Sequence, residues 1–236
     1  FWINVPFGLL CIPLVWITIP ESRGRPEPLD FLGLALVGIG LFGITYGIVR
    51  GNDAGWTSAE VLTGLIGGVA LIVIFIWWES HAASPLLPLR LFSNRSFSMA
   101  NIVGFLFFFG IFGAIFILIQ FLQVVQGANP LEAGLMTMPW TLAPLVVSPL
   151  TGLLTSRIGT RPVIVVGMAL MSIGLLWSGI ILDPSVEYIH FVPPFMAAGV
   201  GMSLVFAPIA AATLQGMAPE DRATASGTNM TVRQVG

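Results

Sequence analysis

Long apolar runs alternate with short polar segments along the whole chain. A helix that crosses a hydrocarbon core of about 30 Å requires about 20 mostly apolar residues. Seven runs meet this length, and an eighth begins near residue 224. The strands of a membrane barrel would be about 10 residues long with strict alternation, unlike FLFFFGIFGAIFILIQF at 105–121. The pattern therefore predicts an all-α integral membrane protein. The seven runs are 3–20, 31–50, 59–78, 98–122, 133–154, 162–182 and 190–216.

The polar segments between the runs predict the orientation of the helices. Basic residues close to the ends of spans favour the cytoplasmic side. The first, third, fifth and seventh segments contain arginine, whereas the others contain none and only Arg50 borders the second. We therefore expect the odd-numbered segments on the cytoplasmic side of an inner or plasma membrane. Their arginines are Arg23 and Arg25 in 21–30, Arg90 and Arg95 in 79–97, Arg157 and Arg161 in 156–161, and Arg222 in 217–224.

Composition supports a membrane protein and excludes other classes. The 236 residues are 56% hydrophobic and 8% charged, whereas a soluble domain carries about 25% charged residues. A net charge of −2 provides no basic field for nucleic acid. The one cysteine, Cys11, provides neither a disulfide framework nor a cysteine metal site. Because the chain opens on FWINVPFG and stops at RQVG inside a helical pattern, we expect a fragment of a longer protein.

Small residues predict where helices pack closely. Between helices in lipid the hydrophobic effect contributes little, so residues that allow backbones to approach matter more. Gly43 and Gly47 in the second run, and Gly64 and Gly68 in the third, form two G-x-x-x-G patterns. They predict a tight pair of helices.

Prolines predict a bend in the fifth run. Pro139, Pro144 and Pro149 follow one another at intervals of five residues. Each removes a backbone donor and crowds the preceding turn. Freed carbonyls are costly against lipid, so we expect the bend to face other helices or a cavity.

Enzyme chemistry is missing from the sequence. GIGLFG at 38–43 matches the dinucleotide fingerprint, but it lies inside an apolar run rather than between a strand and a helix. The two histidines, His81 and His190, belong to segments on opposite sides of the membrane. Glu79 and Glu132 lie near the ends of runs, where a solvated position is expected. We therefore predict no enzyme activity, no metal site and no cofactor.

Uncharged polar residues and one arginine are the candidates for a site. A set of them falls within the fourth, fifth and last runs, where each has two interpretations. Each residue can form an interhelical hydrogen bond, and together they would suit a cavity for a bulky amphipathic molecule. The candidates are Asn101, Gln120, Gln123, Trp140, Thr141, Asn229 and Arg233.

The segment GLLTSRIGTRP at 152–162 resembles the cytoplasmic-loop signature of the major facilitator superfamily, G-x-L-a-D-r-x-G-r-r. Ser156 stands where that signature has Asp, so a gating salt bridge through the Asp has no counterpart here. In the family the loop joins the second and third helices of a six-helix half, which places the start of that half near residue 98. The positions that match are Gly152, Leu154, Arg157, Gly159 and Arg161.

Three further stretches resemble the fourteen-helix drug:proton antiporter branch of the EmrB/QacA type: FWINVPFG, PLLPLRLFSNRSF and RATASGTNMTVRQVG. The resemblance implies an incomplete major-facilitator bundle from about helix six into helix thirteen. Residues 1–20 would be the last helix of the N-terminal half, 21–97 linkers and two extra spans, and 98–236 a truncated C-terminal half.

The resemblance implies proton-coupled export of amphipathic organic compounds by alternating access. The proton gradient would supply the energy, and the arginine loop would be a cytoplasmic gate. The expected partners are the lipid bilayer and a small amphipathic substrate, with accessory efflux subunits left open. Two alternatives are a facilitator-type carrier for one metabolite and a membrane scaffold that does not transport.

Overall fold

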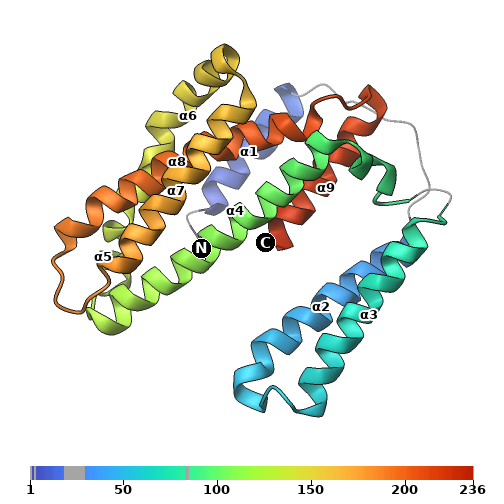
Figure 1. Cartoon of the computed structure of the whole chain (residues 1–236), viewed down its shortest axis with the longest axis horizontal. Coiled ribbons are helices and arrows are strands. Elements are labelled where there is room, and N and C mark those ends of the chain that lie inside the picture. The colour runs from blue at the N-terminus through green and yellow to red at the C-terminus, as the bar shows by residue number, and fades with distance from the viewer. Residues whose placement is uncertain (1, 3, 19–29, 83–84, 236) are drawn as a thin grey trace. The chain divides into compact units, whose positions relative to one another are not determined.

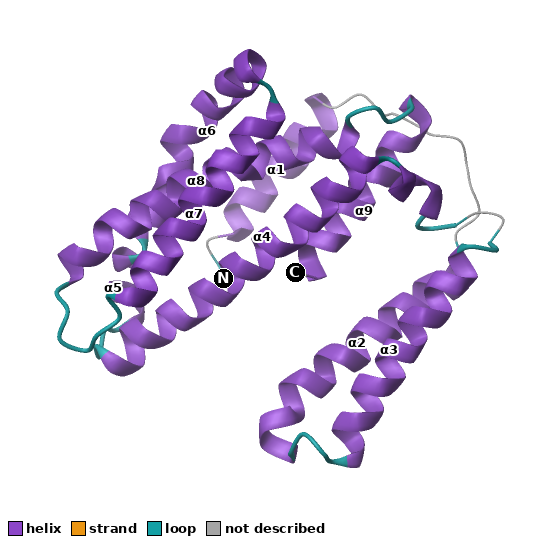
Figure 2. Ribbon diagram, in the orientation of Figure 1, coloured by secondary structure: helices purple, strands orange, loops and turns teal. Residues whose placement is uncertain are grey.

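The computed structural model describes residues 2, 4–18, 30–82 and 85–235. All regular structure in these residues is helical (Figures 1 and 2), which confirms the predicted fold class. Six of the described helices are long and apolar enough to cross a membrane. They are α2 (Phe31–Ala54), α3 (Ala59–Glu79), α4 (Arg95–Gln120, continued by the π-helical turn η2, Phe121–Val125), α6 (Met138–Ile158), α7 (Thr160–Ile180) and α8 (Val192–Leu214, preceded by the 3-10 turn η3, Tyr188–Phe191).

Shorter elements account for the rest of the described helices. α1 (Asn4–Thr18) is apolar but has 15 residues, fewer than the run predicted there, whose last residues lie outside the described ranges. The predicted first polar segment, with Arg23 and Arg25, also lies outside them except for Asp30. The other short elements are η1 (Leu89–Ser93), α5 (Pro130–Met136), η4 (Pro219–Asp221) and α9 (Arg222–Val235).

The fifth run, predicted as one helix over 133–154, is two helices. Asn129 starts α5 early, because its side chain accepts from the Glu132 backbone N–H while the Glu132 carboxylate accepts from the Asn129 N–H. The helix breaks at Thr137, and Pro139 lies in the first turn of α6, where a missing N–H costs nothing. Pro139 therefore begins a helix and does not bend one. Pro144 and Pro149 lie inside α6.

The chain divides into two compact units, Phe1–Leu86 and Leu87–Gly236. In the first, α2 and α3 form a hairpin that packs through glycines. A Cβ on Gly64 would lie 2.8 Å from the carbonyl oxygen of Gly43, and one on Gly68 would lie 2.6 Å from that of Gly40. Two of the GIGLFG glycines therefore face α3 as a packing surface.

Glu79, at the end of α3, is placed differently from its predicted solvated position. The residue is only 3% exposed, and a Cβ on Gly33 at the start of α2 would lie 2.9 Å from its Oε1. Beside it, the Asp30 carboxylate accepts from the Gly33 N–H at 2.8 Å and from the Trp78 indole N–H at 2.8 Å. The prediction is wrong because it rested only on the position of Glu79 near the end of an apolar run. The sequence does not show that the start of α2 packs over this residue.

In the second unit α8 is the most buried helix. It packs against α6 and α7 and also contacts α4 and α9 (Figure 1). Close approach depends on glycines: a Cβ on Gly199 would lie 2.5 Å from the carbonyl oxygen of Trp140 in α6, and one on Gly201 would lie 2.4 Å from the Met171 nitrogen in α7. The largest apolar core of the described residues forms around these contacts and includes Phe107, Phe191 and Phe195.

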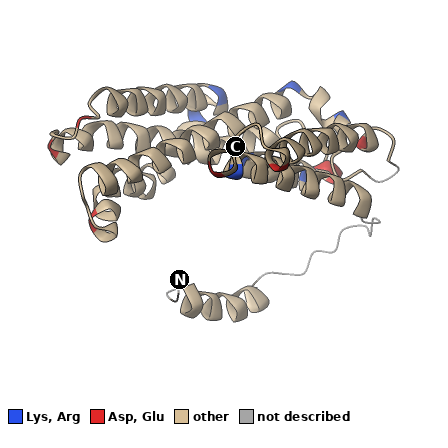
Figure 3. Cartoon of the chain, turned by 90° about the horizontal axis from the view of Figure 1, so that it is seen from below, with Lys and Arg blue, Asp and Glu red and all other residues tan. Residues whose placement is uncertain are grey.

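Several charged and polar contacts of this unit lie at helix ends, and Figure 3 shows most charged residues of the chain at helix ends. At one end Arg90 donates to both carboxylate oxygens of Asp221, at 2.9 and 2.6 Å. At the other end the Gln126 amide donates to the Val186 carbonyl oxygen at 3.1 Å. Because the spans alternate in direction, the α6–α7 turn lies at the same end of the unit as Arg90.

Candidate functional site: a polar and aromatic pocket on α4, α8 and α9

Two buried asparagines join α4 to α9. The Asn229 Nδ2 donates to Asn101 Oδ1 at 3.1 Å, and the Asn101 Nδ2 donates to the backbone oxygen of Phe97 at 2.9 Å. Each residue is 3% exposed. Buried amides require such partners, and this pair fixes which face of α9 meets α4.

Gly104 gives α9 the room to approach. It lies three residues after Asn101 on α4, and a Cβ there would lie 3.3 Å from Arg233 Cγ and 3.7 Å from Asn229 Nδ2. Asn229 and Arg233 are four residues apart and so share one face of α9. The structure therefore brings three of the predicted site residues together: Asn101, Asn229 and Arg233.

The Arg233 guanidinium is held between two aromatic rings. Its Cζ lies 4.6 Å from the ring centroid of Phe108 in α4 and 4.6 Å from that of Phe206 in α8. The negative faces of aromatic rings attract a cation at such distances. Within the described ranges, Arg233 forms no salt bridge with a carboxylate. The rings thus hold its charge without neutralising it.

Arg233 also lies beside the interior of two membrane-length helices. Its ring partners Phe108 and Phe206 lie well inside the apolar segments Arg95–Val125 and Tyr188–Leu214, which are long enough to cross a membrane. A charged side chain in such a position is costly and is the usual mark of a functional site.

A pocket of about 290 Å³ opens beside this arginine. Its lining combines aromatic, thioether, amide and guanidinium groups from three helices, so it presents apolar and polar surfaces together. The lining residues are Phe108, Phe112, Phe206, Met230, Arg233 and Gln234.

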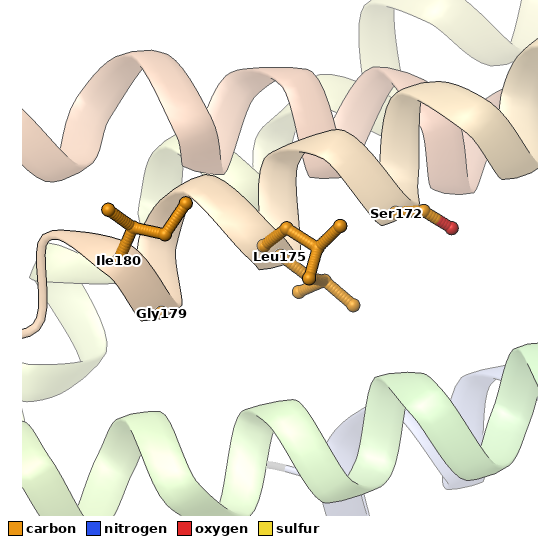
Figure 4. A pocket seen from close by; sticks show the side chains of 5 residues that line it. Ser172, Leu175, Gly179 and Ile180 are labelled. Atoms are coloured by element: carbon orange, nitrogen blue, oxygen red, sulfur yellow. The ribbon is translucent and has the colours of Figure 1, made fainter.

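A larger hollow, of about 570 Å³, lies along α7 and is less suited to a specific ligand. All of its lining residues belong to that one helix, and Ser172 is the only one with a polar side chain (Figure 4). Leu176 and Ile180 in its lining are 68% and 83% exposed. An open apolar face of this kind is what lipid contact requires. We therefore take the pocket at Arg233 as the candidate site.

The other predicted cavity residues lie apart from this pocket. Gln120 ends α4 and Gln123 lies in η2, about 12 Å or more along the helix from Phe112, the lining residue nearest to them in the chain. Trp140 is 3% exposed and packs against Phe195 in the core, with ring centroids 6.3 Å apart. The Thr141 hydroxyl donates to the backbone of its own helix.

Sequence reasoning missed Phe108 and Phe206. Phe108 belongs to a run of similar phenylalanines, and Phe206 lies among other apolar residues. The one available signal was the arginine itself, because a charge in a span requires partners from neighbouring helices.

The predicted gating loop is a turn of a single residue. α6 ends at Ile158 and α7 begins at Thr160, so Arg157 and Arg161 lie on helices rather than in a loop. Gly159 joins the helices at φ 86° and ψ 165°, a conformation open almost only to glycine. Both arginines and Gly152 are exposed. The arrangement leaves both arginines exposed at this end of the second unit.

The chain belongs to the major facilitator superfamily, because the model of that family matches residues 1–236. Proteins of this superfamily are membrane carriers and not enzymes. The family predicted from the loop signature is thus confirmed, and with it a multi-pass membrane location.

Named relatives include the multidrug resistance protein Stp of Mycobacterium tuberculosis, 30% identical over 237 residues that cover all of this chain and 44% of Stp. The multidrug resistance protein B homolog of the same organism is 31% identical over 245 residues, covering 100% of this chain and 44% of the relative. The multidrug export protein EmrB of Escherichia coli is 29% identical over 229 residues, which cover 96% of this chain and 45% of EmrB. The chain therefore spans less than half the length of these relatives.

Proposed function

We propose that the full-length protein containing this segment exports amphipathic organic compounds across the inner or plasma membrane. The observation that supports this best is Arg233, held between Phe108 and Phe206 in an otherwise apolar bundle. A pocket with apolar walls and one charged group suits a molecule that is itself part apolar and part polar. The names of Stp and EmrB, which describe multidrug resistance and export, support the same function.

The proposed mechanism is alternating access, in which one half of the protein rocks against the other about a site near the midplane. In this mechanism α4, α8 and α9 form one wall of the substrate path. The ends that carry Arg90, Arg157 and Arg161 face the cytoplasm. The α6–α7 turn then contacts neighbouring helices as the halves move.

The proposed energy source is the proton gradient. Coupling requires a group that gains and loses a proton in the transport cycle. The described acidic residues lie near helix ends or in the connections between helices, and Glu79 is a buried one among them. We therefore assign the coupling group to a part of the full-length protein other than the middle of these spans.

Transport by the full-length protein in inverted membrane vesicles tests this function. Energised vesicles with the protein should accumulate amphipathic fluorescent dyes faster than matched vesicles without it, and a protonophore should abolish the difference. Competition by many unrelated amphipathic compounds is expected, whereas competition by one metabolite alone would identify a facilitator-type carrier. Equal uptake with and without the protein would overturn the proposal in favour of a scaffold.

A further inference from the structure

The edge of the Arg233 guanidinium is available to a ligand. Phe108 and Phe206 lie against the group, each ring centroid 4.6 Å from Cζ. The five N–H donors of a guanidinium lie in its plane and form a fork that matches a carboxylate or phosphate. In the described part of the chain, no hydrogen bond and no salt bridge uses these donors. They can therefore serve a group that comes from outside.

The charge that lines the pocket is positive and belongs to Arg233. Among the six lining residues of the pocket Arg233 is the only charged one, and Gln234 adds an amide that can donate. The Asn101–Asn229 pair next to it is neutral and directs its amide hydrogen bond inward, between the two helices. An uncompensated cation in a region of low dielectric attracts an anion and repels another cation.

The apolar part of the lining fits an aromatic body. Phe112 is 58% exposed, Phe206 is 46% exposed and Met230 is 66% exposed, so their surfaces remain open for contact. Met side chains adapt to irregular shapes and contact aromatic rings favourably. A ligand with a ring system and an acidic group would use both parts of the pocket.

We infer that this pocket selects amphipathic anions: the acidic group of the substrate accepts hydrogen bonds from the edge of Arg233, and its aromatic part packs against Phe112, Phe206 and Met230. The inference rests on the proposed export function and names the charge of the substrate. It distinguishes this protein from an exporter of lipophilic cations, for which the same position would require a carboxylate.

Three probes with one ring system and different charges test the inference: 1-pyrenebutyrate, its neutral amide, and the matching pyrenylbutyl-trimethylammonium cation. Their binding to the full-length protein in lipid nanodiscs would be measured by fluorescence, with empty nanodiscs as the control for partition into lipid. The carboxylate should bind about tenfold more tightly than the amide, as charge-assisted hydrogen bonds are stronger than neutral ones, and the cation should bind least tightly. Equal binding of carboxylate and amide would overturn the inference.

Variants assign the preference to Arg233. R233Q should weaken binding of the carboxylate until it equals the amide within about twofold, with amide binding unchanged. R233K keeps the charge but loses the planar fork, so part of the preference should remain. R95Q removes an exposed arginine from the start of α4 and should leave the preference intact. R233Q could instead weaken binding of the carboxylate and the amide probes equally, and R233K could restore binding of both. That result would show that Arg233 pairs with a carboxylate of the protein itself and would overturn the inference.

The export proposal is tested separately, with the same three probes in energised vesicles. Accumulation of amide and carboxylate at equal rates in energised vesicles would sustain export and overturn anion selection. If vesicles with the protein accumulate none of the three probes, and no dye of the wider set, both proposals fail.

Discussion

Asn229 of α9 donates a hydrogen bond to Asn101 of α4 over 3.1 Å, and both residues are almost completely buried. The two residues are 128 positions apart in the chain. The bond sets the rotation of α9 about its own axis, since Asn229 cannot meet Asn101 from another face. Arg233, one turn further along, is thereby directed to the gap between Phe108 and Phe206.

Removing either asparagine is expected to destabilise the helix pair. Asn101→Ala or Asn229→Ala leaves a buried amide without its partner, at a cost of about 1 kcal/mol. A double-mutant cycle on the full-length protein in detergent, followed by thermal unfolding, should give a coupling of about 0.6 kcal/mol, typical of hydrogen bonds between membrane helices. Strictly additive single effects would show that the hydrogen bond contributes nothing.

The α2–α3 hairpin should tolerate alanine at one glycine and not at its neighbour. A Cβ on Gly68 would lie 2.6 Å from the Gly40 carbonyl oxygen and 2.7 Å from the Ile44 nitrogen. A Cβ on Gly67 would meet no such atom within 4 Å. Because backbone atoms cannot move aside cheaply, Gly68→Ala should destabilise by about 1–3 kcal/mol. Gly67→Ala should be neutral or slightly stabilising. Equal melting temperatures for the two variants would contradict the observed packing.

The α6–α7 turn should require glycine at position 159. An alanine at φ 86° and ψ 165° is strained by about 1–3 kcal/mol. Gly159→Ala is therefore expected to lower the melting temperature and the rate of dye accumulation. Gly152→Ala is the control, because Gly152 has open space around its Cβ position. Loss of activity in both variants would point to a cause other than backbone conformation.

The Arg90–Asp221 pair should hold the α8–α9 connection against η1, the element that precedes α4. The Asp221 side chain is only 13% exposed although that of Arg90 is 69% exposed. R90Q is expected to cost about 0.5–1 kcal/mol and to increase hydrogen exchange of residues 217–224. R95Q, at an exposed arginine nearby, is the matched control. High salt should reduce the difference between the wild type and R90Q, and an unchanged difference would argue against an ionic contact.

Much of the helix arrangement could be predicted from the sequence. Apolar length defined the spans because a bilayer imposes one thickness on every helix. The glycine patterns indicated the α2–α3 pair, since glycines such as Gly43 and Gly64 let two helix backbones approach closely. The break at Thr137 was missed because Asn129 and Pro139 act through local capping, which hydropathy does not report.

The candidate site could be predicted only in part. Asn101, Asn229 and Arg233 stood out as polar residues in apolar runs, but their meeting depends on how α9 packs against α4. Gln120, Trp140 and Thr141 stood out by the same criterion, and the structure separates them from the pocket. Polarity in a span marks a residue as unusual, and only packing shows which of these residues share a site.

The connection between α6 and α7 has a mechanical consequence. One residue, Gly159, separates the helices, and α8 packs closely against both, through Gly199 on one and Gly201 on the other. At the end of the unit that carries this turn, α6 therefore cannot move away from α7 on its own. We expect a displacement of α6 to be passed to α7 through the turn and to α8 through the glycine contacts, and so to reach Phe206, which lies on α8.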